Sequence, residues 1–169
     1  GSYQCTITDA NNCIVSISIL VDQPDPIIPN VSATAVYCNG GSNGTATANP
    51  TGGTGPYTYL WSDAPTYSTT STVTGLSAIV YFVEVTDALN CPPVTHAISI
   101  NEPDSIVAVG IMSDVSCNNG NDGFIDITVI GGTGIFTYQW GSGENTEDLN
   151  NIPIGYYNVI ATDQNGCSI

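Results

Sequence analysis

The sequence predicts an all-β protein, built from tandem immunoglobulin-like β-sandwich domains in a linear array. Three observations predict this fold. Short runs rich in Val, Ile, Thr and Tyr alternate with polar residues, the pattern of half-buried strands. Gly, Pro, Asn and Asp interrupt these runs roughly every 8 to 12 residues, the spacing of turns in a β-sandwich. The same motifs recur after about 77 residues, which is the length of one small domain.

Two motifs carry the repeat. The first is an aromatic residue, alternating apolar positions, Thr-Asp, a short turn and Cys, and it occurs at 3–13, 81–91 and 157–167. The second is Gly-Gly-Thr-Gly followed by aromatic residues at every second position and ending in Trp, at 52–61 and 131–140. Their spacing predicts three parts: 1–24 as the C-terminal fragment of a preceding repeat, 25–103 as a complete repeat, and 104–169 as a repeat lacking its last strand.

The last repeat shows the expected order of strands. They are predicted at 106–112, 124–130, 135–140, 149–152 and 155–162. The middle repeat follows the same order and adds a final strand at 95–100, which the opening fragment matches at 16–21. Gly-rich turns separate the strands, because Gly and Asn tolerate positive φ.

The third strand of each repeat carries an aromatic face. Tyr57, Tyr59 and Trp61 point to one side of the strand, as do the corresponding residues of the next repeat, because strand side chains alternate. This face is expected to build the core, with a partly exposed row of tyrosines as the alternative. The linkers at 21–26 and 101–104 are short and contain proline, so that neighbouring domains should form a semi-rigid rod.

The charge composition excludes several classes of partner. The 169 residues include no Lys or Arg and 15 Asp and Glu. Without cations the surface cannot neutralise phosphates, which excludes nucleic acid and anionic lipid as partners. No apolar run approaches the roughly 20 residues of a membrane-spanning helix.

The six cysteines predict disulfides, because domains this small bury too little surface to be stable on their cores alone. Matching positions in the two repeats predict the pairs Cys38–Cys91 and Cys117–Cys167. Each bond would close a loop of about 50 residues and add roughly 4 kcal/mol in the chain-entropy picture. The partners of Cys5 and Cys13 stay open. Disulfides place the protein in an oxidising, extracellular setting.

These motifs resemble the SprB repeat of Bacteroidota surface adhesins, which is related in style to PKD-type immunoglobulin-like domains. The segments that carry the resemblance are 38–40, 52–61, 73–76 and 81–91, and again 117–120, 131–140, 149–152 and 155–167. The middle copy departs from the family pattern at Ile79 and Asn90, where the family has Gly. The resemblance implies a long, secreted cell-surface repeat protein used in adhesion or gliding, exported by the type IX route, and it carries over no catalytic residues.

Candidate metal and catalytic residues are few. His96, the single histidine, is expected to be a strand-end residue without a catalytic role. The recurring Asp9, Asp87 and Asp163 are expected to cap turns. A calcium site is the alternative, with Asp22, Asp25, Asp87, Glu102 and Asp104 as candidate ligands. The acidic residues Glu144, Glu147 and Asp148 are expected to form a solvated loop. The Gly-Gly-Thr-Gly loops lack the Lys and the following helix of a phosphate loop.

Three positions are candidates for glycosylation. Asn30 and Asn43 lie in Asn-X-Ser/Thr tripeptides. Ser105 lies in Asp-Ser-Ile, which resembles the Bacteroidota O-glycosylation motif.

Two functions therefore compete, and neither is enzymatic. The first is a structural or adhesive rod of disulfide-linked β-domains outside the cell, with no cofactor. Its partners would be neighbouring repeats or identical subunits arranged head to tail, with possible strand addition by residues 16–21. The second is a carbohydrate-binding adhesin module assisted by calcium.

Overall fold

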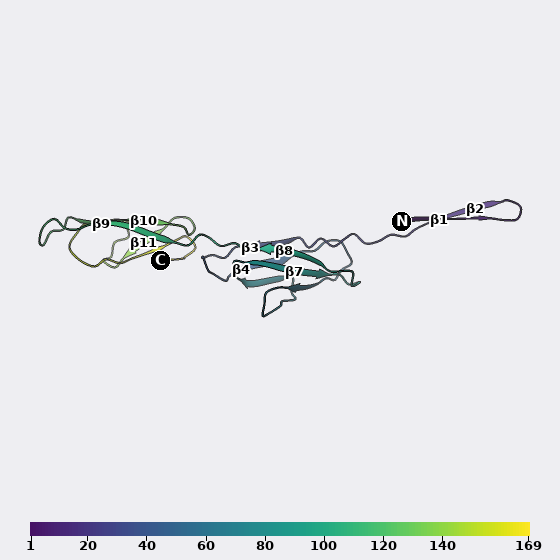
Figure 1. Ribbon diagram of the computed structural model, residues 1–169, viewed down its shortest axis with the longest axis horizontal. Coiled ribbons are helices and arrows are strands. Elements are labelled where there is room, and N and C mark those ends of the chain that lie inside the picture. The colour runs from purple at the N-terminus through teal and green to yellow at the C-terminus, as the bar shows by residue number, and fades with distance from the viewer.

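The computed structural model describes residues 1–169 as an elongated chain of three parts lying in line (Figure 1). It contains thirteen strands and no helix. The strands are β1 Ser2–Thr8, β2 Ile14–Leu20, β3 Val31–Thr34, β4 Gly44–Ala48, β5 Thr58–Trp61, β6 Thr72–Leu76, β7 Val80–Thr86, β8 Val94–Ser99, β9 Val107–Ser113, β10 Gly123–Ile130, β11 Thr137–Trp140, β12 Leu149–Ile152 and β13 Val159–Thr162. The predicted all-β, tandem sandwich fold is confirmed.

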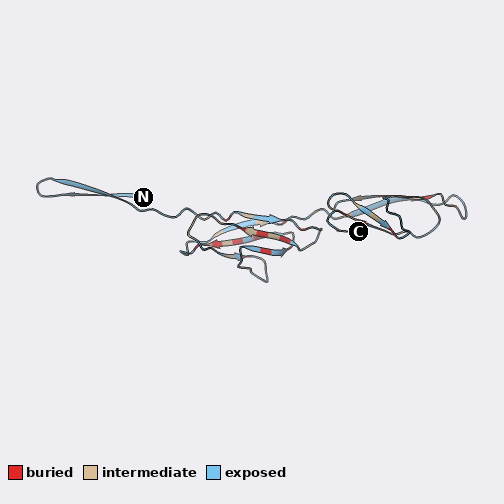
Figure 2. Cartoon of the chain, turned by 180° about the vertical axis from the view of Figure 1, so that it is seen from behind, coloured by how far each residue is buried: buried red, intermediate tan, exposed pale blue.

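The first part is a lone hairpin. Strands β1 and β2 pair antiparallel from Ser2–Leu20 to Thr8–Ile14 and touch no other sheet. Every residue of both strands is exposed, and Figure 2 shows the hairpin in the exposed colour along its length. Its apolar side chains therefore have no packing partner within the chain. The predicted strand at 16–21 is β2, which begins two residues earlier.

The middle domain, β3 to β8, consists of two antiparallel sheets packed face to face. One sheet has the order β3-β4-β6 and the other β5-β7-β8. Strand β7 alternates buried and exposed residues, and its Tyr81, Val83 and Val85 face the opposite sheet. Trp61, at the end of β5, is completely buried and donates from Nε1 to the carbonyl of Thr70 at 2.9 Å. Ten buried residues form this core.

The last domain, β9 to β13, repeats the arrangement with a smaller core. Its sheets are β9-β10-β12 and β11-β13. The other edge of β13 bonds only to Ser168 and Ile169. Trp140 takes the place of Trp61 and donates from Nε1 to the carbonyl of Thr146 at 2.9 Å. It packs with Ile127 and Leu149 in a cluster of three buried residues. The smaller core predicts that this domain is the less stable of the two.

The strand predicted from the sequence is longer than β13. The predicted strand begins at residue 155, whereas β13 begins at Val159. Its counterpart β7 is seven residues long because β8 pairs along its free edge. Residues 155–158 have no such neighbour, and the partner strand β11 is four residues long.

The aromatic face of the third strand is part core and part exposed row. The tryptophans are core residues, whereas Tyr57, Tyr59 and Tyr138 are half-buried and line the edge of the sandwich. The hydroxyl of Tyr57 donates to the carbonyl of Gly52, which ties the glycine-rich loop to the strand that follows it.

Candidate functional site at the joint between the domains

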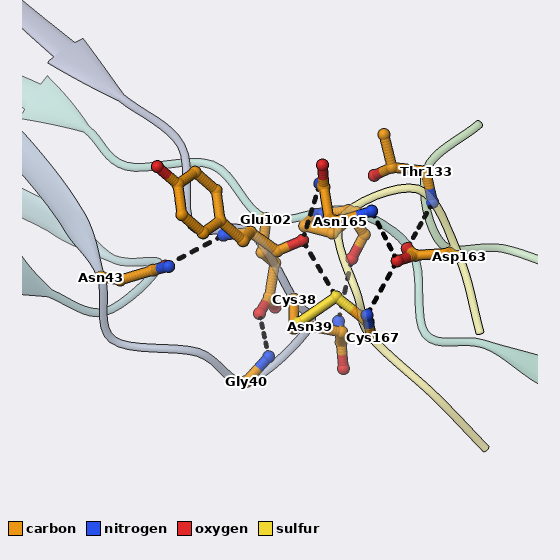
Figure 3. Close-up of a disulfide and its surroundings, with 11 residues drawn as sticks. Cys38, Asn39, Gly40, Asn43, Glu102, Thr133, Asp163, Asn165 and Cys167 are labelled. Carbon is orange, nitrogen blue, oxygen red and sulfur yellow. Dashed lines mark hydrogen bonds between the residues drawn. A yellow bond between two sulfur atoms is a disulfide. The ribbon is translucent and has the colours of Figure 1, made fainter.

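The middle and last domains meet at a joint that two covalent connections cross. The first is the linker between β8 and β9. The second is a disulfide between Cys38, in the loop after β3, and Cys167, in the turn after β13, whose α-carbons lie 5.6 Å apart. Figure 3 shows the bond between loops that belong to different domains.

The predicted pairs Cys38–Cys91 and Cys117–Cys167 are wrong in this structure. Cys38 is bonded to Cys167, and both Cys91 and Cys117 are free. The reason is strand direction. Strand β3 runs toward the last domain, so that Cys38 lies at the joint, whereas β7 runs the opposite way and leaves Cys91 at the far end of the middle domain. The two cysteines of one domain are therefore a domain length apart.

Three polar contacts accompany the disulfide. The side-chain amide of Asn165 donates to the carbonyl of Tyr37 across the joint at 3.1 Å. Asn39 donates to the carbonyl of Pro103 at 3.1 Å, and the backbone N–H of Gly40 donates to the Glu102 carboxylate at 2.7 Å. The first contact joins the Cys167 turn to the loop that carries Cys38, and the other two hold the linker against that loop (Figure 3).

No sequence motif indicated the roles of Asn39 and Asn165. The only available signal was their position, each within two residues of a repeated cysteine. The sulfur of Cys167 also lies 3.3 Å from the Tyr37 carbonyl oxygen, a contact rather than a hydrogen bond because a disulfide sulfur carries no proton.

Asp163 shapes the turn that presents Cys167. It is buried, and its Oδ1 accepts from the backbone N–H groups of Asn165 at 2.9 Å and Cys167 at 2.8 Å. Its Oδ2 accepts from Thr133 in the glycine-rich loop at 2.8 Å. Burial acts to raise the pKa of Asp163, but the donating N–H groups of Cys167, Thr133 and Asn165 outweigh it, and the pKa is lowered. The carboxylate thus fixes the turn in its charged form.

The same turn recurs at Asp87. Its Oδ1 accepts from Leu89 at 3.1 Å and Cys91 at 3.0 Å, and its Oδ2 accepts from Thr54 at 3.2 Å. The backbone N–H of Cys91 is the largest cause of a lowered pKa for Asp87. The Asp87 carboxylate in turn raises the pKa of the Cys91 thiol. Asp9 holds the turn of the hairpin in the same way, accepting from Asn11 and Cys13 at 2.8 Å each.

The glycine-rich loops hold the linkers. The N–H of Gly132 donates to the carbonyl of Asp104 at 2.9 Å, and that of Gly53 donates to Asp25 at 2.6 Å. Gly131 has a φ of +84°, and a Cβ there would lie 2.1 Å from the carbonyl oxygen of Ser105. Only glycine permits this close approach. The loops therefore set the angle at which each linker enters its domain.

The calcium candidates do not converge. No group of three or more His, Cys, Asp or Glu side chains is arranged to hold a metal ion. Asp87 is engaged by backbone N–H groups, Glu102 binds Gly40, and Asp22 accepts from the N–H of Gln23 at 2.9 Å. Asp25 and Asp104 contribute their backbone carbonyls to the glycine-rich loops.

The remaining candidate residues are dispersed. His96 lies exposed on β8, where it pairs with Val83 of β7. In the acidic loop, Glu147 accepts from the hydroxyl of Tyr138 at 2.9 Å, and Asp148 accepts from the N–H of Ile127 at 3.0 Å. Burial, followed by Glu147, raises the pKa of Tyr138 to about 12. Glu144 lies exposed at the start of this loop.

The three glycosylation candidates are exposed. The amide nitrogen of Asn30 donates to the carbonyl of Asn49 at 3.2 Å, and the side-chain oxygen of Asn43 accepts from the N–H of Tyr37 at 3.0 Å. Ser105 lies on the linker beside Gly131.

Comparison with known proteins finds one family match in each domain. Residues 30–66 and 109–145 match the family model described as SprB repeat. Each match spans the first cysteine loop, the glycine-rich loop and the buried Trp of one domain. No curated protein matches the chain.

A solved structure supports the fold. The three N-terminal domains of the bacteriophage RB49 Highly Immunogenic Outer Capsid protein (Hoc) resemble this chain with a TM-score of 0.52 and 19% sequence identity. The similarity covers 85% of this chain and 57% of that structure, so that the chain spans little more than half of its length. These matches describe a module of repeat type.

Proposed function

We propose that this chain, which carries two SprB repeats, is a stretch of a non-catalytic extracellular rod that supports the adhesive part of a surface protein or filament. The observation that carries this proposal is the joint. The linker and the Cys38–Cys167 bond connect the domains at two separate points. A body attached to its neighbour at two points cannot swing as one attached by a single linker can. The joint is suited to keeping domains in line.

The chemistry of the surface supports an extracellular place. Disulfides persist in oxidising compartments and are rare in the cytosol. The formal charge of −15 with no Lys or Arg suits a molecule that repels anionic surfaces and presents no site to trypsin-like proteases. A search for helices long and apolar enough to span a membrane finds none.

The dispersion of the reactive side chains supports a non-catalytic role. The single histidine is exposed on β8, and the buried carboxylates Asp87 and Asp163 are occupied by backbone N–H groups.

Small-angle X-ray scattering tests the rod. The oxidised chain is expected to give the maximum dimension of the extended arrangement and a narrow distribution of shapes. The variant Cys38→Ser/Cys167→Ser should bend at the joint and show a smaller mean radius of gyration, with Cys5→Ser/Cys13→Ser as the matched control. Identical scattering from all three proteins, or a compact oxidised chain, would contradict the proposal.

Association with identical subunits by strand addition is part of the proposal. In the middle domain the residue after β8, Ile100, is buried beside Gly44. The corresponding place in the last domain, beside Gly123, is an apolar pocket of about 640 Å³ that Met112, Phe124 and Ile152 help to line. Residue Val21, before Asp-Gln-Pro, matches Ile100, before Asn-Glu-Pro. The strand β2 of a second copy would fill this pocket.

Sedimentation tests this association. The chain is expected to form head-to-tail oligomers that grow with concentration in reducing buffer. Val21→Asp should abolish them while leaving the thermal stability of the domains unchanged. Val15→Asp, at the other end of β2, is the control and should weaken association less. If the wild-type chain is monomeric at all concentrations, strand addition is wrong, but the proposal that the domains form a rod is unaffected.

A second candidate function is carbohydrate binding. Leu60, Tyr67 and Phe82 are exposed around a shallow pocket of about 200 Å³ on the middle domain, with Glu84 at its rim. Exposed aromatic faces stack on sugar rings, and carboxylates accept from their hydroxyl groups. A glycan array with and without calcium separates this candidate from the passive rod. Binding that Phe82→Ser removes would favour it.

A further inference from the structure

The loop that carries Cys38 is built a second time at Cys117. In both loops the third residue after the cysteine donates its N–H to the cysteine carbonyl at 2.9 Å: Gly41 to Cys38, and Gly120 to Cys117. The residue before the cysteine donates to the side chain of Asn43 in one loop and Asp122 in the other, at 3.0 Å in both. The left-handed residues correspond as well, since Gly40 has a φ of +71° and Asn119 one of +62°. The Cys117 loop therefore has the conformation that forms the joint.

The turn that carries Cys167 is likewise built a second time at Cys91. The Asp lies four residues before the cysteine in each turn, and its carboxylate accepts from the backbone N–H groups two and four residues after it. The left-handed residue before the cysteine is Asn90 in one turn and Gly166 in the other. Cys91 is half-buried, as Cys167 is, and Cys117 is exposed. The loop half of the disulfide joint therefore occurs twice, and the turn half occurs three times, since Cys13 ends a turn of the same kind. One loop cysteine, Cys117, and two turn cysteines, Cys13 and Cys91, are unbonded.

We propose that, in the two domains, Cys117 and Cys91 are open halves of the same joint, each bonding to the complementary cysteine of another repeat. Cys117 would bond to the turn cysteine of a following repeat, and Cys91 to the loop cysteine of a preceding one. They cannot bond to each other within the chain, because they lie at its two outer domain ends. The partner is a second repeat of this kind. The inference goes beyond the rod itself and does not depend on what the rod adheres to.

The contacts around the two open halves define the complementary surface. Asn118 corresponds to Asn39, which donates to the linker at the formed joint. Leu89 corresponds to Asn165, so that the Cys91 face replaces a hydrogen bond across the joint with an exposed apolar side chain. The Cys117 loop thus keeps the asparagine that can donate to a following linker, while the Cys91 turn presents an apolar side chain in place of the amide.

The bond forms by oxidation of two thiols. Cys91 and Cys117 each lose the hydrogen on Sγ, and the two sulfurs join. The two electrons and two protons pass to a disulfide oxidant, such as oxidised glutathione, which becomes two glutathione thiols.

In the proposed rod, each domain pair would have one inter-repeat disulfide at Cys91 and another at Cys117. The segment between Cys91 and Cys117 runs through β8, the linker and β9, which follow one another in the same direction across two domains. It is therefore extended already. With a disulfide at each end, tension along the rod passes through this extended segment, and the strands β3 to β7 are bypassed. The structure would gain little length before a covalent bond breaks.

Two variants that each keep one open half test the pairing. Both carry Cys5→Ser and Cys13→Ser; one adds Cys117→Ser and keeps Cys91, and the other adds Cys91→Ser and keeps Cys117. One is labelled with ¹⁵N. The two are mixed in a glutathione redox buffer and separated on non-reducing gels. The linked peptides are mapped after cleavage at acidic residues, because trypsin has no site in the chain.

The expected product is the mixed dimer joined by Cys91 and Cys117, in roughly tenfold excess over either homodimer. Each variant alone should run as a monomer on the non-reducing gel. Random pairing, with mixed dimers making up half of all dimers, would overturn the proposal, as would no dimer at all. Circular dichroism of both variants checks that the fold is intact, so that the absence of dimers reports on the joint.

Discussion

Cys38 and Cys167 are separated by 129 residues of sequence and belong to different domains, yet their α-carbons are 5.6 Å apart and their sulfurs are bonded. The bond encloses most of both domains within one covalent loop. It therefore determines how the chain responds to tension as well as how the two domains are oriented.

Force applied at the two termini should be carried by this bond. In the oxidised chain residues 39–166 are bypassed, so that pulling from Gly1 and Ile169 extends only the hairpin and the segments next to it. Reduction adds about 128 residues to the path, which is roughly 420 to 460 Å of contour length at 3.3 to 3.6 Å per residue. Single-molecule force spectroscopy with and without reductant measures this difference. Equal extension in both conditions would show that the bond does not join the domains.

Acid should weaken both cysteine turns. The pKa values of Asp87 and Asp163 are lowered in the folded protein, from an ordinary value of 3.8. A carboxyl group with a lowered folded pKa contributes stability that is fully present above its unfolded pKa and is lost as the pH falls through the folded value. The melting temperature should therefore be constant between about pH 5 and 7 and fall below pH 4. Asp163→Asn should flatten this dependence in the last domain. If the melting temperature of that variant falls below pH 4 as steeply as that of the wild type, the Asp163 carboxylate does not stabilise the turn.

Removing the buried Trp140 should unfold the last domain selectively. Its core is a cluster of three buried residues, and a Trp-to-Ala change in a core costs about 3 to 5 kcal/mol. In Trp140→Ala the single remaining tryptophan, Trp61, reports on the middle domain. Its fluorescence transition in denaturant should persist, while circular dichroism shows a lost or earlier second transition. Ile135→Ala, at a side chain 81% exposed, is the control and should change stability by less than about 0.5 kcal/mol.

The glycine-rich loop should tolerate no side chain at Gly131. Its φ is +84°, and a Cβ would meet the Ser105 carbonyl oxygen at 2.1 Å, so that the linker must move. Gly166 is a matched control, since its φ is +83° and nothing lies within 4 Å of an added Cβ. Gly166→Ala should cost about 1 kcal/mol from backbone strain alone. Gly131→Ala should lower the free energy of unfolding by clearly more, as measured by denaturant titration. Equal losses in the two variants would show that the contact with the linker does not constrain residue 131.

Much of the fold could be predicted from local patterns. Alternating apolar residues place β7 and β10, and the repeated glycines mark the tight loops, because both signals are local. The tryptophans could be assigned to the core for the same reason. The half-exposure of Tyr57 and Tyr59 could not, since it depends on how far the facing sheet extends.

The disulfide pairing could not be predicted because it depends on strand direction. If each strand simply reversed the one before it, the fifth strand of a repeat would run like the first, and Cys91 would return to the end where Cys38 lies. The loop at 62–71 instead carries the chain back along the domain, so that β6 runs in the same direction as β5. This one crossing inverts β7 and places Cys91 at the opposite end. Equal spacing of cysteines in the repeats therefore gave Cys38 and Cys167 the wrong partners, and it assigned bonds to Cys91 and Cys117, which are free.

Disulfide mapping of the purified, oxidised chain tests the central claim most directly. The protein is alkylated without reduction, cleaved at acidic or aromatic residues, and analysed by mass spectrometry. The account predicts one linked peptide pair containing Cys38 and Cys167, with Cys91 and Cys117 alkylated in the monomer. Peptides that link Cys38 to Cys91 and Cys117 to Cys167 would contradict it, because the domains would then be joined by their linker alone.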